Sequence, residues 1–296
     1  MQISANGLSI EVDDRGPPGG PALLLIMGLG MQLVAWPDEM VQQLVARGFR
    51  VIRFDNRDIG LSQHFDRVDS PGVPWSAVRY AMHLPVRAPY ALRDMAADAA
   101  GVLDALGIRA AHVCGASMGG MIAQHLAATH PERVLSLTLL MTTAGARHLP
   151  QPGLRVRQAM LGRPASDDPA DVVVHLQRLL AVIGSPAYPP DPDWQRSRLL
   201  AAARRSWRPA GTARQLLAVM ADGDRTPLLG AIRAPSIVIH GEADPLIPVA
   251  AGHHLVQHLR GATADFIPGM GHDLPVPLLP RLVAGIAGNA QRASGA

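Results

Sequence analysis

The chain contains no lysine and few aromatic residues. All 27 of its basic residues are arginines, and aromatic side chains make up 4% of its 296 positions. The arginines are scattered along the sequence and are not gathered into one basic stripe. Aromatic side chains that could stack on bases are scarce as well. We therefore expect no nucleic-acid partner, although the sequence pI is about 9.7.

Cysteines and long apolar runs are scarce too. Cys114 is the single cysteine, so the chain cannot form an internal disulfide bond. No apolar run reaches the roughly 18 residues that a membrane-spanning helix needs. Residues 1–7 lack the basic and apolar regions of a secretion signal. These absences predict a cytoplasmic protein without a membrane partner.

The apolar content is high enough for a sizeable core. Hydrophobic residues make up 48% of the chain and charged residues 17%, a balance typical of soluble globular proteins. The length of 296 residues lies near the size at which single cores usually stop growing. We therefore expect one large domain, with or without an insertion.

Strand and helix patterns alternate along most of the chain. Apolar or alternating runs predict strands at residues 7–12, 22–27, 49–54, 110–114, 134–141, 236–240 and 264–267. Apolar stripes at helical spacing predict helices at residues 37–46, 91–107, 118–130, 249–259 and 277–289. This alternation indicates an α/β fold, with a mostly parallel central sheet flanked by helices.

Residues 144–225 interrupt the alternation, because they contain helical patterns and no convincing strand. Helices are expected there at residues 169–183, 192–207 and 211–221. We interpret 144–225 as a helical cap inserted over the sheet, with 1–143 and 226–296 forming the core. Residues 63–90 are expected to be an irregular connection at the border of the site.

Residues 115–119 (Gly-Ala-Ser-Met-Gly) carry the strongest local signal in the chain. They follow the strand predicted at 110–114 and precede a helix with an apolar face. A nucleophile for acyl transfer needs its oxygen exposed at a sharp strand-to-helix turn, and small neighbours let the backbone make that turn. This context favours a nucleophilic role for Ser117 over an ordinary glycine-rich turn.

His272 is the candidate base, because a serine hydroxyl is a weak nucleophile at neutral pH and needs a neighbouring base. His272 ends the loop at 268–272 (Pro-Gly-Met-Gly-His), directly after the last predicted strand. The carboxyl ends of parallel strands share one edge of a sheet, so this loop should meet the turn at Ser117. His83 and His240 are interpreted as structural.

Two acidic residues follow the preceding strand, and either could orient His272. We prefer Asp244 over Glu242, because Pro245 fixes the loop just beyond it. Glu242 remains the alternative. Asp273 is discounted, since neighbours in sequence rarely aim their side chains at each other.

No cofactor or metal ion is predicted. His254 and His258 are spaced like two ligands on one helical face, but no third ligand is apparent. Cys114 ends a buried strand and is expected to be an inert thiol.

Apolar side chains near these loops could form the wall of a pocket. Four methionines are expected either to line it or to fill the core beneath it: Met27, Met31, Met118 and Met270. The predicted cap helices carry further large apolar side chains whose direction the sequence leaves open: Leu176, Leu180, Trp194, Leu199 and Trp207.

The chain resembles the α/β-hydrolase superfamily over nearly its whole length. Ser117, Asp244 and His272 occur in the nucleophile–acid–base order of that fold. Four segments are similar to the aclacinomycin methylesterase-like carboxylesterases: residues 25–28 (Leu-Ile-Met-Gly), 36–39 (Trp-Pro-Asp-Glu), 55–62 (Asp-Asn-Arg-Asp-Ile-Gly-Leu-Ser) and 268–272 (Pro-Gly-Met-Gly-His). One departure is Met27, because a histidine commonly precedes this glycine in the superfamily.

The resemblance implies a cofactor-free carboxylic ester hydrolase. It assigns the N–H groups of Leu29 and Met118 to an oxyanion hole, and it favours a small-molecule ester, such as a methyl ester of a bulky acid. The same side chains serve lactonases, C–C bond hydrolases and perhydrolases, so these activities remain alternatives. A ligand-binding protein without turnover is the alternative outside the enzymes. Oligomeric state cannot be read from the sequence.

Overall fold

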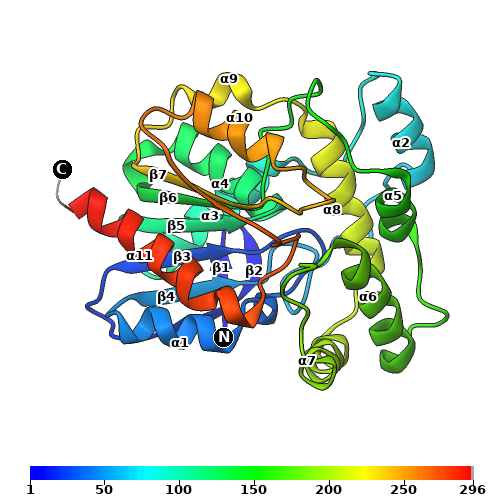
Figure 1. Cartoon of the computed structure of the whole chain (residues 1–296), viewed down its shortest axis with the longest axis horizontal. Coiled ribbons are helices and arrows are strands. Elements are labelled where there is room, and N and C mark those ends of the chain that lie inside the picture. The colour runs from blue at the N-terminus through cyan, green and yellow to red at the C-terminus, as the bar shows by residue number, and fades with distance from the viewer. Residues whose placement is uncertain (295–296) are drawn as a thin grey trace.

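Eight strands form the central sheet of residues 1–294, the residues that the computed structural model describes (Figure 1). The strands are β1 (Gln2–Ala5), β2 (Leu8–Arg15), β3 (Ala22–Ile26), β4 (Arg50–Phe54), β5 (Ala111–Ala116), β6 (Val134–Leu140), β7 (Ser236–Gly241) and β8 (Thr263–Ile267). They are ordered β1-β2-β4-β3-β5-β6-β7-β8. The β1–β2 and β2–β4 pairs are antiparallel, and all later pairs are parallel. The expected mostly parallel sheet is confirmed.

Helices cover both faces of this sheet. The α-helices are α1 (Asp38–Ala46), α2 (Val73–Ala81), α3 (Leu92–Ala105), α4 (Met118–Thr129), α5 (Leu154–Leu161), α6 (Pro169–Ile183), α7 (Pro192–Arg205), α8 (Pro209–Asp222), α9 (Thr226–Leu229), α10 (Ala250–His258) and α11 (Leu279–Ser294). Short 3-10 helices occur at η1 (Leu33–Ala35), η2 (Pro131–Arg133) and η3 (Val276–Leu278). Helices α1 and α11 pack on one face, and α3, α4 and α10 pack on the other.

The apolar run of β3 explains why the sheet needs helices on both sides. Leu23 and Leu25 point into the core beside α1 and α11, whereas Leu24 and Ile26 point into the core beside α3 and α4. Successive side chains of a strand alternate between the two faces of the sheet, so a strand without polar residues must be covered on both faces. All five residues of β3 are buried.

The structure contains elements that the sequence analysis did not predict: helices α2, α5 and α9 and strand β1. Residues 63–90 contain α2, where an irregular connection was expected. Pro74 lies in the first turn of α2, a position at which a helix tolerates proline because no N–H is needed there. Strand β1 was also missed, because its four residues are partly exposed and show no apolar run.

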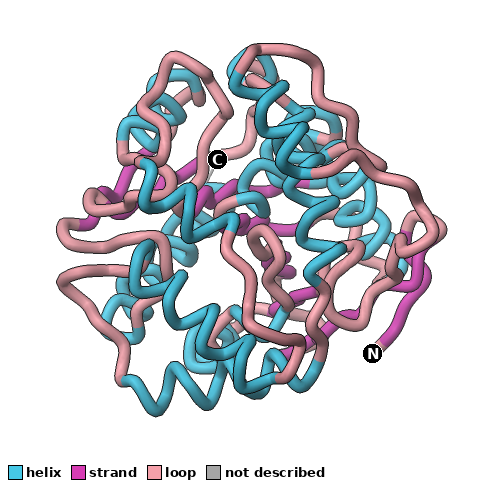
Figure 2. The backbone as a smooth tube through the Cα atoms, turned by 90° about the vertical axis from the view of Figure 1, so that its right-hand side faces the viewer, coloured by secondary structure: helices cyan, strands magenta, loops and turns pink. Residues whose placement is uncertain are grey.

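Helices α5 to α8 come from residues 144–225 and lie on the side of the molecule that Figure 2 faces. In that view helices and loops stand in front of the strands. Residues of α6 and α7 line the same cavity as Ser117, which directly follows β5. This segment therefore faces the carboxyl ends of the parallel strands.

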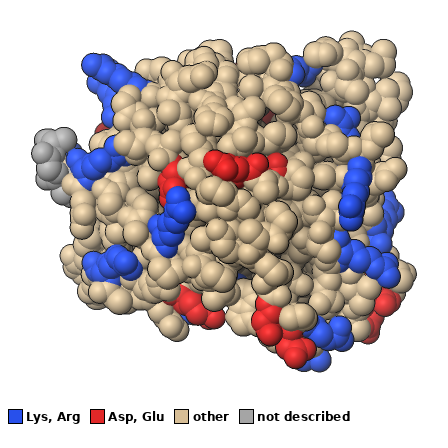
Figure 3. All heavy atoms as spheres, in the orientation of Figure 1, with Lys and Arg blue, Asp and Glu red and all other residues tan. Residues whose placement is uncertain are grey.

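Charged side chains are scattered over the face of the molecule that Figure 3 shows. In the face that Figure 3 shows, basic side chains stand singly or in small groups, with acidic side chains between them. None of the helices within residues 1–294 combines the length and the hydropathy that a membrane-spanning segment requires.

Candidate active site

Ser117 lies at the sharp turn between β5 and α4, with φ 54° and ψ −121°. A non-glycine residue with positive φ is strained, and such strain is found mainly at functional sites. The turn depends on its glycines, because a Cβ at Gly119 would lie 2.0 Å from the carbonyl oxygen of Ile26. A Cβ at Gly115 would lie 2.3 Å from the carbonyl oxygen of Gly119. The close packing of this turn therefore requires the small residues that flank the serine.

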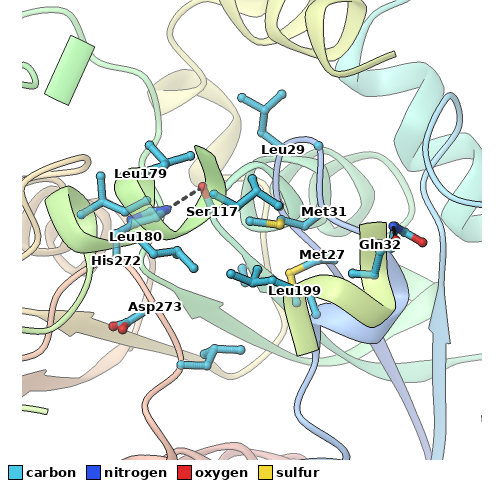
Figure 4. A pocket seen from close by; sticks show the side chains of 18 of the residues that line it. Met27, Leu29, Met31, Gln32, Ser117, Leu179, Leu180, Leu199, His272 and Asp273 are labelled. Atoms are coloured by element: carbon cyan, nitrogen blue, oxygen red, sulfur yellow. Dashed lines mark hydrogen bonds between the residues drawn. The ribbon is translucent and has the colours of Figure 1, made fainter. Parts of the chain in front are cut away.

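The structure brings Ser117, His272 and Asp244 into one hydrogen-bonded chain. His272 Nε2 lies 3.0 Å from Ser117 Oγ, the contact drawn as a dashed line in Figure 4. His272 Nδ1 lies 2.7 Å from Asp244 Oδ2. An ionised carboxylate can only accept, so Nδ1 carries the proton and Nε2 is free to accept from the serine hydroxyl. This arrangement can move a proton from oxygen to imidazole.

Asp244 is held so that one oxygen faces His272. Its Oδ1 accepts from the backbone N–H groups of Leu246 and Ile247, at 2.9 and 2.8 Å. The carboxylate is buried, with both oxygens occupied. Glu242, the alternative acid, has an exposed side chain.

Asp273 also lies away from this chain of contacts. Its carboxylate accepts a short hydrogen bond from the Ser185 hydroxyl. Burial is the main influence and raises the pKa of Asp273. Its side chain points away from Ser117 in Figure 4, although it lines the same cavity.

His240 packs beside the carboxyl group of Asp244. It is fully buried, and its Nε2 donates to the carbonyl oxygen of Ile247 at 2.7 Å. The same Nε2 lies 3.6 Å from Asp244 Oδ2. Burial lowers the pKa of His240, which keeps it neutral. The neutral ring therefore adds no second charge beside the Asp244 carboxyl group.

The N–H groups of Leu29 and Met118, the two donors named in the sequence analysis, lie beside Ser117, and no hydrogen-bond acceptor within residues 1–294 pairs with either of them. The carbonyl oxygen of Gly28 accepts from Met31 N–H at 3.2 Å, so the Leu29 N–H of the same trans peptide points the opposite way. A Cβ at Gly28 would lie 3.1 Å from Ser117 Cβ, which places this loop directly beside the serine. Met118 is the first residue of α4, where the helix leaves its N–H groups unpaired.

A cavity of about 410 Å³ opens in front of Ser117 and His272. Met27, Met31 and Met118 line it. Met270 does not belong to this wall: it is fully buried in the core beside α11, which corresponds to the second of the two roles considered for it. The large apolar side chains of α6, α7 and the following turn line the cavity as well: Leu176, Leu180, Trp194, Leu199 and Trp207. The cavity therefore suits a ligand with a large apolar part.

Sequence reasoning missed the ion pairs that attach the helical segment to the core. Asp55, at the end of β4, accepts from Leu33 and Leu61 N–H groups and from Arg205 of α7 at 2.7 Å. Asp58 receives two hydrogen bonds of 2.7 Å from Arg214 of α8. The sequence does show a run of charged residues directly after a buried strand. The arginines that pair with Asp55 and Asp58, however, lie about 150 residues away in sequence.

The remaining titratable candidates lie outside this site. His254 and His258 stack with ring centroids 4.1 Å apart, and His254 Nε2 contacts Thr226 Oγ1 at 2.8 Å. Within residues 1–294, no group of three or more histidine, cysteine, aspartate or glutamate side chains is arranged to hold a metal ion. Burial raises the pKa of the Cys114 thiol, which therefore stays protonated.

Comparison with known proteins agrees with this architecture. The sequence pattern of the family described as alpha/beta hydrolase fold matches residues 21–275. Rhodomycin D methylesterase DnrP of Streptomyces peucetius is 31% identical, over 99% of this chain and 98% of that protein. A 2-hydroxy-6-oxononadienedioate/2-hydroxy-6-oxononatrienedioate hydrolase of Paraburkholderia xenovorans is 28% identical, over 90% of this chain and 84% of that protein.

Solved structures share the fold at lower identity. A meta-cleavage product hydrolase from Pseudomonas fluorescens superimposes with a TM-score of 0.74 at 18% identity, covering 99% of this chain and 98% of that one. An esterase from Rhodococcus sp. superimposes with a TM-score of 0.72 at 23% identity, covering 98% of this chain and 97% of that one. The methylesterase relative confirms the resemblance seen in the sequence. Together with the family pattern, it shows that the chain belongs to the α/β-hydrolase fold family.

Proposed function

We propose that this protein is a serine hydrolase that cleaves carboxylic esters, with Ser117 as nucleophile, His272 as base and Asp244 as orienting acid. The observation that carries the proposal is the hydrogen-bonded chain from Asp244 through His272 to Ser117, at the floor of a largely apolar cavity. The unpaired N–H groups of Leu29 and Met118 beside the serine support it.

The first half-reaction acylates the serine. His272 Nε2 takes the Ser117 proton as Oγ attacks the ester carbonyl carbon, and Asp244 stabilises the imidazolium that forms. The Leu29 and Met118 N–H groups donate to the carbonyl oxygen as it becomes an oxyanion. When the tetrahedral intermediate collapses, the imidazolium protonates the leaving alkoxide, and an alcohol departs.

The second half-reaction releases the acid. A water molecule enters where the alcohol left, His272 takes one of its protons, and the hydroxide attacks the acyl carbon. The same oxyanion site stabilises the second tetrahedral intermediate. Collapse returns the proton to Ser117 Oγ and releases the carboxylic acid. Every proton in these steps is carried by His272, so the cycle uses no metal ion or organic cofactor.

The size and lining of the cavity favour an ester with a bulky acid part. The volume of about 410 Å³ lies in the range of pockets that bury most of a drug-sized ligand. Methionine side chains fit irregular apolar shapes, which suits a polycyclic acid better than acetate. The name of the relative from Streptomyces peucetius supports a methyl ester as the group that is cleaved. In this proposal residues 144–225 form the cap that builds one wall of the cavity.

The proposal is tested by covalent labelling together with turnover. A fluorophosphonate should label the wild-type protein stoichiometrically, and Ser117→Ala should abolish labelling while reducing ester turnover by about a million-fold. A panel of methyl esters, p-nitrophenyl esters, lactones and vinylogous diketones separates ester hydrolysis from the alternative activities of the fold.

Two outcomes would contradict the assignment. A folded wild-type protein that neither takes up the probe nor turns over any ester would favour a binding protein. Retention of most turnover by Ser117→Ala would place the nucleophile elsewhere.

A further inference from the structure

The loop that carries His272 is held by the end of α6 as well as by the core. The His272 N–H donates to the carbonyl oxygen of Ile183, the last residue of α6, at 2.7 Å. The Ala187 N–H donates to the carbonyl oxygen of Gly269 at 3.2 Å. The backbones approach so closely that a Cβ at Gly271 would lie 2.3 Å from the carbonyl oxygen of Gly184. The end of α6 therefore fixes the backbone of His272 and of the residues just before it.

Ser185 is the side chain that joins these two segments. It is 5% exposed, and its Oγ accepts from the Gly271 N–H at 2.8 Å. The same hydroxyl donates to Asp273 Oδ1. One hydroxyl thus bridges the residue before His272 and the residue after it. Buried polar groups that are fully paired are costly to break, so this bridge restricts the loop to one conformation.

A second side chain of the helical segment holds the loop that carries Leu29. Gln215 on α8 is fully buried, and its Oε1 accepts from the Gly30 N–H at 2.9 Å. Its Nε2 donates to the carbonyl oxygen of Arg57 at 2.9 Å. Gly30 has φ +68°, and a Cβ there would lie 2.7 Å from Thr212 Cγ2, so α8 packs directly on this loop. The peptide that follows Leu29 is therefore fixed from α8.

We propose that Ser185 and Gln215 are positioning residues of the ester hydrolase proposed above, and that the helical segment orients the catalytic loops in addition to enclosing the cavity. Ser185 sets the His272 loop at its hydrogen-bonding distance from Ser117, and Gln215 aims the Leu29 N–H at the oxyanion. Neither side chain lines the cavity, so neither is a substrate contact. The inference rests on the proposed function.

A positioning role predicts a loss of kcat with little change in KM. A base or an oxyanion donor displaced by about 1 Å can slow the chemical step by up to about 100-fold, whereas ground-state binding in the cavity is unchanged. Ser185→Ala and Gln215→Met should each lower kcat for a p-nitrophenyl ester by about 10- to 100-fold, with KM changed by less than about two-fold. The rate constant for fluorophosphonate inactivation should fall in parallel, because that reaction uses the same base and the same donors.

Matched controls separate this role from general stability. Ser166→Ala removes an exposed hydroxyl that lies just before the opposite end of α6 and donates to Asp171, and it should leave kcat unchanged. Gln158→Met changes an exposed glutamine on α5 and should do the same. Ser185→Thr keeps the bridging hydroxyl and should recover most of the kcat that Ser185→Ala loses. Thermal unfolding of every variant shows that it is folded at the assay temperature.

The variants distinguish failure of this inference from failure of the proposed function. Wild-type kcat in folded Ser185→Ala and Gln215→Met would overturn the inference and leave the proposed function standing. An equal loss in Ser185→Thr and Ser185→Ala would also overturn the role of the hydroxyl. If Ser185→Ala does not fold, Asp273→Ala removes the acceptor of the Ser185 hydroxyl and is held to the same kcat criterion. Absence of both labelling and turnover in the wild-type protein would instead refute the proposed function itself.

Discussion

The carboxylate of Asp244 uses its two oxygens for different partners, and this determines which nitrogen of His272 carries the proton. Oδ1 is occupied by the Leu246 and Ile247 N–H groups, so only Oδ2 faces the imidazole. A residue of the same shape that donates at this position would force the opposite tautomer. The orientation of the ring would be kept, but its ability to act as a base would not.

Asp244→Asn should therefore lower kcat by about 10⁴-fold without unfolding the protein. The asparagine oxygen would take the two backbone N–H groups, and its amide would donate to His272 Nδ1. The proton would then sit on Nε2, which could no longer accept from Ser117. Saturation kinetics and thermal unfolding measure the two effects.

Glu242→Gln is the matched control for that variant. Glu242 is exposed and stands two residues earlier in the same loop, so its kcat should stay within about two-fold of wild type. A large loss in Glu242→Gln together with activity in Asp244→Asn would reverse the assignment of the acid.

Helix α8 is attached to the core by a buried ion pair as well as by Gln215. Arg214 is 5% exposed, Asp58 is fully buried, and the two form a bidentate contact at 2.7 Å. Tyr90 and the Phe65 N–H complete the set of donors to Asp58, each at 2.9 Å. Burial acts to raise the pKa of Asp58, but the hydrogen bonds, above all that of Arg214, hold it below its ordinary value. The Asp58 carboxylate therefore stays charged, and its burial is stabilised by the Arg214 guanidinium.

Arg214→Met should lower the free energy of unfolding by about 3–5 kcal/mol, because it leaves that carboxylate buried without its counter-ion. Urea unfolding at neutral pH measures the loss. Arg281→Met removes an equally short but more exposed pair with Asp265, at 2.6 Å, and should cost no more than about 1 kcal/mol. Similar losses in the two variants would show that the Asp58 pair contributes no more than a surface pair.

At the scale of the whole molecule, buried histidines couple folding to pH. Burial lowers the pKa of His112 below its ordinary value of 6.5. The folded protein then stays unprotonated at this ring, whereas the unfolded chain takes up a proton below about pH 6.5. The stability associated with His112 is present above that pH and is lost as the pH falls toward the folded-state pKa.

His112→Phe isolates this contribution. Below about pH 6.5 the wild-type protein should lose stability relative to the variant by up to about 1.4 kcal/mol per pH unit. The carboxyls of Asp55 and Asp98, whose pKa values are raised by burial, act in the opposite direction and cancel in the comparison. Urea unfolding of both proteins at pH 7.5, 6.5 and 5.5 would show the trend, and a stability difference independent of pH would contradict it.

Most strands of the sheet could be predicted because each is marked by the pattern of its own residues. The run Ala22–Ile26 is apolar throughout, and such a run forms a strand buried on both faces in many contexts. Strand β1 and helix α2 were not predicted, because their residues are partly exposed and contain no continuous apolar run. The positions of Ser117, Asp244 and His272 could be predicted as well, since each lies on a loop directly after a strand.

The sequence by itself determined the fold class, the strand-to-helix turn at Ser117 and the loops on which Asp244 and His272 lie, because these depend on neighbouring residues and on the order of the strands. Only the tertiary structure decided which side chains hold those loops. Ser185 and Gly271 are 86 residues apart, and Gln215 and Gly30 are 185 residues apart. A hydrogen bond between such distant residues leaves no periodic or compositional pattern in the chain, and it exists only once the helical segment has folded back onto the sheet.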